Sequence, residues 1–170
     1  DPAGGGDSTD LSAAVAAAQS GDMLVLMPAD YTASTLFLDI QAKALVIAGD
    51  PGGTVTLPPL FLTSVPAGGT FVLRHLVFEA NSLTGLGDGT VLINNSAGNV
   101  HIEDCTIDGF PGGGTFGMAT PGRVALRISG NTGAIAIHRS VLSGGVGKST
   151  ASFPFTMTQR MPVLSFSGST

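Results

Sequence analysis

The chain has 170 residues, a length typical of one domain, and 43% of them are hydrophobic while 11% are charged. This composition excludes a disordered chain, because it supplies enough apolar surface for a core. Seven Lys and Arg against 12 Asp and Glu give a net charge of -5, which argues against nucleic acid and anionic membrane surfaces as partners. No apolar run approaches the ~18 residues of a membrane-spanning helix, and the single cysteine, Cys105, excludes an internal disulfide.

An alanine-rich segment near the N-terminus predicts a capping helix over residues 8–20. Three apolar residues fall at i, i+4 and i+7, on one face of such a helix: Leu11, Val15 and Ala18. Ser8, Thr9 or Asp10 can cap its start, and Gly21 can end it. A solenoid with an open end needs such a cap, because its last strands and its apolar core are otherwise exposed.

Paired apolar strands recur over residues 23–142. Four segments place two apolar side chains at i and i+2, as a strand with one buried face requires: 36–38, 60–62, 91–93 and 126–128. A second such pair follows each of them after 9 or 11 residues: Leu45 and Ile47, Phe71 and Leu73, Val100 and Ile102, Ile135 and Ile137. The recurrence of nearly the same offset predicts a structural repeat.

The second pair of each copy continues into a third short strand. Superposing residues 71–78, 100–107 and 135–142 aligns four apolar or small inward columns: Phe71, Val100 and Ile135; Leu73, Ile102 and Ile137; Leu76, Cys105 and Ser140; Phe78, Ile107 and Leu142. Coils of three short strands that stack in parallel at about 4.8 Å explain these columns. The predicted fold is therefore an all-β parallel solenoid, with a β-sandwich as the alternative.

The N-terminal segment 11–31 resembles the opening of right-handed parallel β-helix proteins of the pectin lyase-like superfamily. The family pattern runs from a helix through Gly-Asp and an apolar strand to Pro-Gly-x-Tyr. This chain has Gly21-Asp22 and Pro28 to Tyr31, and it departs from the pattern at Ala29 and Asp30. The resemblance covers about residues 8–142. It implies the fold, and a superfamily that contains polysaccharide lyases, hydrolases and epimerases as well as adhesins, phage tailspikes and passengers without catalysis; no active-site motif carries over.

The C-terminal residues repeat the beginning of a coil. Residues 163–170 are similar to residues 126–132, and the loop 143–162 separates them from the preceding coil. We expect one β-helix domain over 1–170 that is a fragment of a longer solenoid, a cleaved product, or a protomer whose open end a partner chain covers.

Two adjacent outward columns consist of ionisable residues. The columns are Arg74, Glu103 and His138, and beside them His75, Asp104 and Arg139. They lie where the inward spacing changes from i, i+2 to i, i+3, which indicates a bend. One interpretation is a catalytic site with a carboxylate base, an Arg that binds an anionic sugar group and a His that transfers a proton. The other is a set of stacked ion pairs, which the alternation of charge between coils favours.

Two further pairs of residues suggest ligand contacts. Glu79 and Asp108 form an outward acidic column that can hold Ca²⁺, the one cofactor we consider, or simply an exposed acidic edge. Phe110 and Phe116 lie in a variable connection and can stack on a sugar ring or cover the core.

A glycine-rich stretch before residue 149 resembles a deviant Walker A loop through Gly144, Gly145, Gly147 and Lys148. A phosphate-binding loop must open a helix, whereas the residues after it have no helical period and include Pro154. We therefore predict no nucleotide site.

The sequence leads to two functional hypotheses. The first is a secreted or cell-surface domain, bacterial in composition, that interacts with polysaccharide or forms the leading part of a carbohydrate-active lyase or hydrolase, inactive as this fragment alone. The alternative is a non-catalytic structural, adhesive or self-assembling module, in which an uncapped C-terminal edge pairs with another chain or with the remainder of the solenoid.

Overall fold

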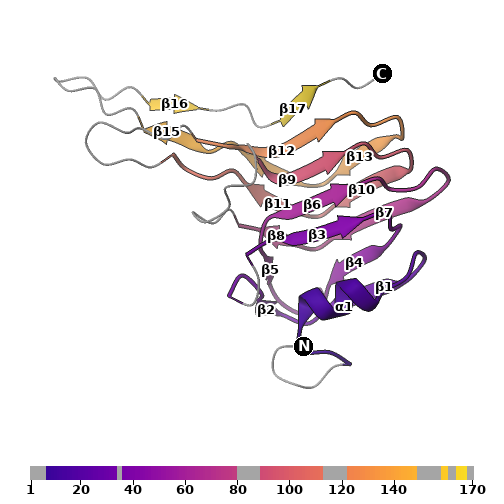
Figure 1. Cartoon of the computed structure of the whole chain (residues 1–170). Coiled ribbons are helices and arrows are strands. Elements are labelled where there is room, and N and C mark those ends of the chain that lie inside the picture. The colour runs from indigo at the N-terminus through magenta and orange to yellow at the C-terminus, as the bar shows by residue number, and fades with distance from the viewer. Residues whose placement is uncertain are drawn as a thin grey trace.

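The computed structural model describes residues 7–33, 36–79, 89–112, 122–148, 158–160 and 164–167. Within these ranges the chain forms one short helix, three parallel β-sheets and one antiparallel strand pair. Figure 1 shows the strands stacked in layers, from the helix at the N-terminal end to the last strand at the C-terminal end.

We name the three sheets A, B and C. Sheet A contains β1 (Met23–Leu26), β4 (Val46–Gly49), β7 (Thr70–Arg74), β10 (Asn99–Glu103) and β13 (Ile135–His138). Sheet B contains β2 (Ala29–Asp30), β5 (Val55–Leu57), β8 (Val77–Phe78), β11 (Thr106–Asp108) and β14 (Val141–Ser143). Sheet C contains β3 (Leu38–Gln41), β6 (Leu60–Thr63), β9 (Gly89–Asn94), β12 (Val124–Ser129) and β17 (Leu164–Ser167). The chain visits sheets C, A and B in turn, so that each circuit lies on the one before.

The strand register confirms the predicted stacking. Leu73 pairs with Ile102, and Ile102 pairs with Ile137, each one coil further along the chain. Phe78 likewise pairs with Ile107. All three sheets are parallel, as a solenoid requires, so the sandwich alternative is wrong.

The first coil differs from the prediction in its sheet C strand. The sequence suggested Leu36 and Leu38 as the inward pair, but Leu38 and Ile40 occupy those positions, opposite Leu60 and Leu62. Leu36 is 53% exposed. The apolar alternation extends over both possibilities, and pairing with β6 selects the later one because it places Ile40 in the core.

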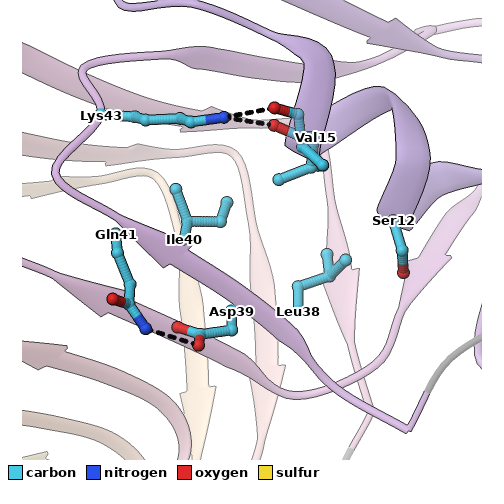
Figure 2. A pocket seen from close by; sticks show the side chains of 8 residues that line it. Ser12, Val15, Leu38, Asp39, Ile40, Gln41 and Lys43 are labelled. Carbon is cyan, nitrogen blue, oxygen red and sulfur yellow. Dashed lines mark hydrogen bonds between the residues drawn. The ribbon is translucent and has the colours of Figure 1, made fainter.

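The predicted cap is helix α1 (Leu11–Ala17), whose N-cap is Asp10. It is shorter than the predicted range 8–20, because it ends at the C-cap Ala18 and not at Gly21. The Asp10 carboxylate accepts a hydrogen bond from the Ala13 N–H at 3.1 Å, the contact expected of an N-cap. At the other end of the helix, Lys43 Nζ donates to the carbonyl oxygens of Val15 at 2.9 Å and Ala16 at 2.8 Å (Figure 2). This lysine fixes the helix beside sheet C and places a positive charge at its C-terminal carbonyls, where the helix dipole favours one.

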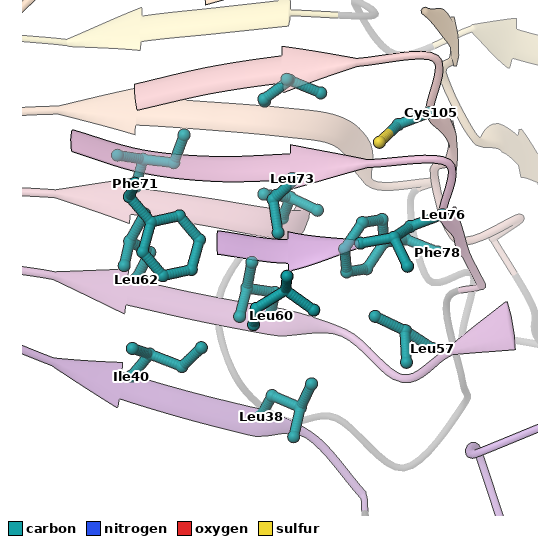
Figure 3. Close-up of a cluster of buried hydrophobic side chains, with 14 of the residues drawn as sticks. Leu38, Ile40, Leu57, Leu60, Leu62, Phe71, Leu73, Leu76, Phe78 and Cys105 are labelled. Carbon is teal, nitrogen blue, oxygen red and sulfur yellow. The ribbon is translucent and has the colours of Figure 1, made fainter. Parts of the chain in front are cut away.

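The inward columns pack together into one continuous core of apolar side chains that runs through the coils (Figure 3). Phe71, Leu73 and Phe78 are fully buried between the three sheets. Cys105 lies in the inward column of Leu76 and is 2% exposed, so the predicted inward position of this thiol is confirmed. Each coil buries its apolar face against its neighbours, which makes the stack, rather than any single coil, the stable unit.

Single residues in the left-handed conformation turn the chain between sheets. They follow the strands of sheet C at Ala42, Ser64, Asn95 and Gly130, and the strands of sheet A at His75, Asp104 and Arg139. We call these places the C–A corner and the A–B corner. A left-handed residue reverses the inward and outward alternation, which explains the change from i, i+2 to i, i+3 spacing that the sequence displays at the A–B corner.

The C-terminal part contains one more strand of sheet C and a strand pair. Leu164 pairs with Leu126 and Phe166 with Ile128, in the register that the repeated segment predicts. Strand β15 (Val146–Lys148) and strand β16 (Thr158–Arg160) form an antiparallel pair inside the segment predicted as a loop. The inward residue Ile137 of β13 is half-buried, whereas its partner Ile102 is fully buried, so the core is partly open above β13.

Candidate functional site

The A–B corner brings the six predicted ionisable residues together, and four of them form two ion pairs between coils. Arg74 Nη2 lies 2.7 Å from Glu103 Oε2, and Arg74 Nε donates to the same oxygen at 2.9 Å. One coil further, the Arg139 guanidinium binds both Asp104 oxygens, each at 2.7 Å. The Arg139–Asp104 contact is bidentate, the strongest geometry that an arginine and a carboxylate can form, whereas Arg74 contacts a single oxygen of Glu103.

Both histidines adjoin the Arg139–Asp104 pair. His75 Nδ1 lies 4.0 Å from Asp104 Oδ2, and His138 Nδ1 lies 2.9 Å from Arg139 Nη1. An arginine only donates, so His138 Nδ1 is the acceptor of that contact.

Hydrogen bonds hold the corner carboxylates in their charged form. The hydrogen bond from Arg74 lowers the pKa of Glu103, and the hydrogen bonds from Arg139 lower the pKa of Asp104. Asp104 in turn raises the pKa of Arg139. A general base that works near neutral pH needs a pKa shifted upward, so this arrangement favours the stacked ion pairs over the catalytic interpretation.

The acidic column of the neighbouring sheet brings two carboxylates into adjacent coils. Asp108 ends β11, and Glu79 directly follows β8, the strand that pairs with β11 in parallel. No group of three or more His, Cys, Asp or Glu side chains that could hold a metal ion occurs among the described residues. Two carboxylates alone fall short of the six or more oxygens that Ca²⁺ takes.

The aromatic candidate Phe110 lies against a cation. The guanidinium carbon of Arg123 lies 5.9 Å from the centre of the Phe110 ring. The backbone N–H of Arg123 also donates to the backbone carbonyl of Phe110 at 2.9 Å, which fixes the two segments together. Phe116 lies outside the described residues.

The glycine-rich stretch leads into a strand. Gly144 and Gly145 connect β14 to β15, and Gly147 and Lys148 belong to β15. Strand β15 pairs with β16 where a phosphate-binding loop would open a helix.

Cys105 has the surroundings of a structural thiol. Burial raises the pKa of Cys105 to about 11, so the thiol stays protonated near neutral pH.

A depression on the outer face of sheet C is the site that the sequence did not point out. It has a volume of about 310 Å³ and is lined by Phe61, Leu92, Asn94, Asn95, Arg127 and Ser129. Phe61, Leu92 and Arg127 are register partners on three successive coils, and so are Asn94 and Ser129 on two. The sequence does contain a signal for this depression: the residues of β6, β9 and β12 that alternate with the inward apolar residues line up in outward columns. These outward columns include apolar residues themselves, so they were not distinguished from the inward ones.

A ring contact and a turn residue lie beside this depression. The rings of Phe37 and Phe61 meet edge to face, with their centres 6.0 Å apart. Gly130 turns the chain at the C–A corner, where a Cβ atom would come within 2.3 Å of Asn95 Oδ1. Gly130 adopts this left-handed conformation without the strain that Ala42, Ser64 and Asn95 bear at the equivalent positions, and it leaves space for the Asn95 amide.

Comparison with known proteins gives no relative: no family, no curated protein and no solved structure matches the chain. Among the described residues, no helix is long and apolar enough to cross a membrane.

Proposed function

We propose that this chain is a secreted or cell-surface right-handed β-helix module, of the pectin lyase-like kind, that binds a polysaccharide with carboxylated sugars at the depression on the outer face of sheet C. Arg127 supplies a local positive charge there, although the net charge of the chain is -5. The observation that carries the proposal is the depression around Phe61, Asn94 and Arg127. Three stacked parallel sheets and an N-terminal capping helix support the fold assignment, together with the resemblance of residues 11–31.

The lining of the depression suits a charged sugar. The ring of Phe61 offers an apolar face to the C–H groups of a pyranose, and Asn94, Asn95 and Ser129 supply amide and hydroxyl groups for its hydroxyls. The Arg127 guanidinium matches the planar geometry of a carboxylate such as that of a uronic acid. A volume of about 310 Å³ is at the lower end of the range of ligand sites and suits a single sugar unit of a longer chain.

The topology also favours sheet C as the binding face. The long connections of the solenoid, residues 79–88, 109–123 and 144–163, all lead into strands of sheet C. Connections on a rigid repeat scaffold carry binding functions more often than the strands beneath them. The ion-paired A–B corner has no part in this proposal, and the proposal includes no catalytic step.

The test is affinity electrophoresis in gels that contain polygalacturonate or a neutral glucan. We expect retardation by polygalacturonate, and its loss in Arg127→Gln and Phe61→Leu, which removes the ring but keeps an apolar side chain. Arg74→Gln is the matched control, because Arg74 is also an outward strand arginine but lies at the A–B corner. Equal retardation of all variants, or none for the parent chain, would refute the proposal.

A second candidate, the non-catalytic assembling module, is favoured by the partly open core above β13. The carbonyls of Ala134 and His138 accept hydrogen bonds from Val100 of β10 and from Asp104 directly after it. The N–H groups of Ile135 and Ile137 therefore face the open side. Hydrogen exchange tests this: slow exchange of the Ile137 amide indicates that another chain covers the edge, and rapid exchange contradicts assembly there.

A further inference from the structure

Among the residues that the structure describes, strand β1 is the edge of sheet A at its N-terminal end and has a strand partner on one side alone. It pairs with β4 on one side and is the first strand of the sheet. The carbonyl oxygens of Asp22 and Leu26 accept hydrogen bonds from the N–H groups of Val46 in β4 and of Asp50 directly after it, at 3.0 and 2.8 Å. Because successive residues of a strand face opposite sides, the backbone groups of Met23 and Val25 face away from β4, toward the open side.

This edge lacks the protection that its neighbours have. At the same end of the solenoid, β2 carries Asp30 and β3 carries Asp39, whereas β1 consists of apolar residues. Charged side chains are a common device against edge-to-edge pairing. Outward-facing apolar side chains add to the exposed surface: Met23 is 57% exposed and Val25 59%.

The space beside the edge is a cleft that helix α1 and the residues directly before it border. Helix α1 is fixed on the side of sheet C through Lys43. A cleft of about 360 Å³ lies between α1 and β1, and Leu11 and Ala14 of the helix face Met23–Leu26 of the strand across it.

The sequence of the edge is self-complementary. Residues 23–27 read Met-Leu-Val-Leu-Met in both directions. Antiparallel pairing of two copies about Val25 places Met23 opposite Met27 and Leu24 opposite Leu26. In this register Asp22 faces Pro28, so no like charges oppose each other within the paired strands, while Asp7 and Asp10 line the cleft beside them.

We propose that β1 is a dimerisation edge, at which a second copy of this chain pairs its own β1 in antiparallel register about Val25. The pairing satisfies the free backbone groups of Met23 and Val25 and joins the two A sheets into one. The carbonyl of Met27 already accepts a hydrogen bond from Tyr31 Oη at 3.1 Å, so it contributes less to the pairing than the carbonyls of Met23 and Val25. A two-fold contact uses the same edge on both copies and stops at a dimer.

Sedimentation velocity of the 170-residue chain over a wide concentration range tests the proposal. We expect a monomer–dimer equilibrium whose dissociation constant rises about tenfold or more in Val25→Lys, because two lysines then face each other across the axis. The matched control is Val141→Lys in β14, since Val141 is also 59% exposed but lies at the other end of the solenoid. Both variants should melt near the parent temperature, because both side chains point to solvent.

Oxidative cross-linking supplies a second measurement. Val25→Cys should give a disulfide-linked dimer, because residue 25 faces itself across the axis, while the native Cys105 is buried and stays unreacted. A parent chain that remains monomeric at all concentrations would overturn the proposal. A dimer that Val141→Lys disrupts and Val25→Lys does not, or one in which Val25→Cys fails to cross-link, would also overturn it.

Discussion

Ser140 Oγ accepts a hydrogen bond at 3.1 Å from the N–H of Cys105, which lies one coil below it at the A–B corner. The C–A corner uses the same device: Asn131 Oδ1 accepts from the Ser96 N–H at 2.6 Å. In both cases the accepting residue directly follows a left-handed corner residue and points inward. These side chains replace the ladder hydrogen bonds that the corners interrupt.

Removing one of these acceptors should therefore lower stability by a predictable amount. Ser140→Ala leaves the Cys105 N–H without its partner, at a cost of about 1–3 kcal/mol. Ser140→Cys should lose less, because the Cys105 sulfur occupies the same place one coil below and accepts a hydrogen bond from the Leu76 backbone N–H. Urea unfolding of the three proteins measures the difference, and equal midpoints would contradict this role of Ser140.

The left-handed residues predict a stabilising substitution. Ala42 is exposed and has a φ of 52°, a conformation that glycine adopts without strain. We expect Ala42→Gly to raise the free energy of unfolding by about 0.5–1 kcal/mol. The control is Ala136→Gly, in the exposed face of β13, which should lower it by a similar amount. If both substitutions destabilise equally, the left-handed assignment at residue 42 is wrong.

The A–B corner predicts an acid-sensitive contribution to stability. The pKa values of Glu103 and Asp104 are lowered in the folded chain, whereas in the unfolded chain they return to about 4. The contribution is therefore complete above the unfolded pKa and is lost as the pH falls through the lowered, folded values. Melting temperatures between neutral and strongly acidic pH should fall less for a Glu103→Gln and Asp104→Asn double variant than for the parent. High salt should reduce the difference.

The same charged substitution should have unequal effects on stability at Ile102 and Ile137, because the two side chains differ in burial. Ile102 is fully buried, so Ile102→Asp should cost about 4 kcal/mol or more and unfold the chain at room temperature. Ile137→Asp, one coil further in the same column, should be tolerated better because Ile137 is half-buried. Circular dichroism and thermal melting compare the two, and a cooperative parent-like melt of Ile102→Asp would contradict the inward column.

Much of the fold was predictable because coils that stack in register repeat their apolar pattern in the sequence. The columns through Leu73 and Phe78 follow from superposing segments without any knowledge of the sheets. Sequence also located the bend at His75 and its two outward columns, since the spacing changes there. The first coil was misplaced by two residues because Leu36, Leu38 and Ile40 all continue the same alternation, and only pairing with β6 decides between them.

The depression on sheet C was not predictable in the same way. Phe61 and Leu92 are apolar residues within apolar strands, so their outward position follows only once the inward partners are fixed. Arg127 is a single cation in such a strand, and its neighbours across the coils come from residues 61 and 92, far away in the sequence. The edge position of β1 was not predictable for another reason. The composition of a strand does not indicate on which sides it pairs, and only the sheet order of the described residues places β1 at the edge.

The central claim is that segments about one coil apart in sequence lie directly beside each other in a fixed register. Val72 and His101 are register partners on the outer face of sheet A, at the ~4.8 Å spacing of neighbouring strands. The double variant Val72→Cys, His101→Cys should form an internal disulfide on mild oxidation, detected by mass spectrometry. The pair Val72→Cys, Asn99→Cys, displaced by two residues and about 7–8 Å apart, should not. Efficient bridging of the displaced pair, or none in the aligned pair, would contradict the stacked solenoid.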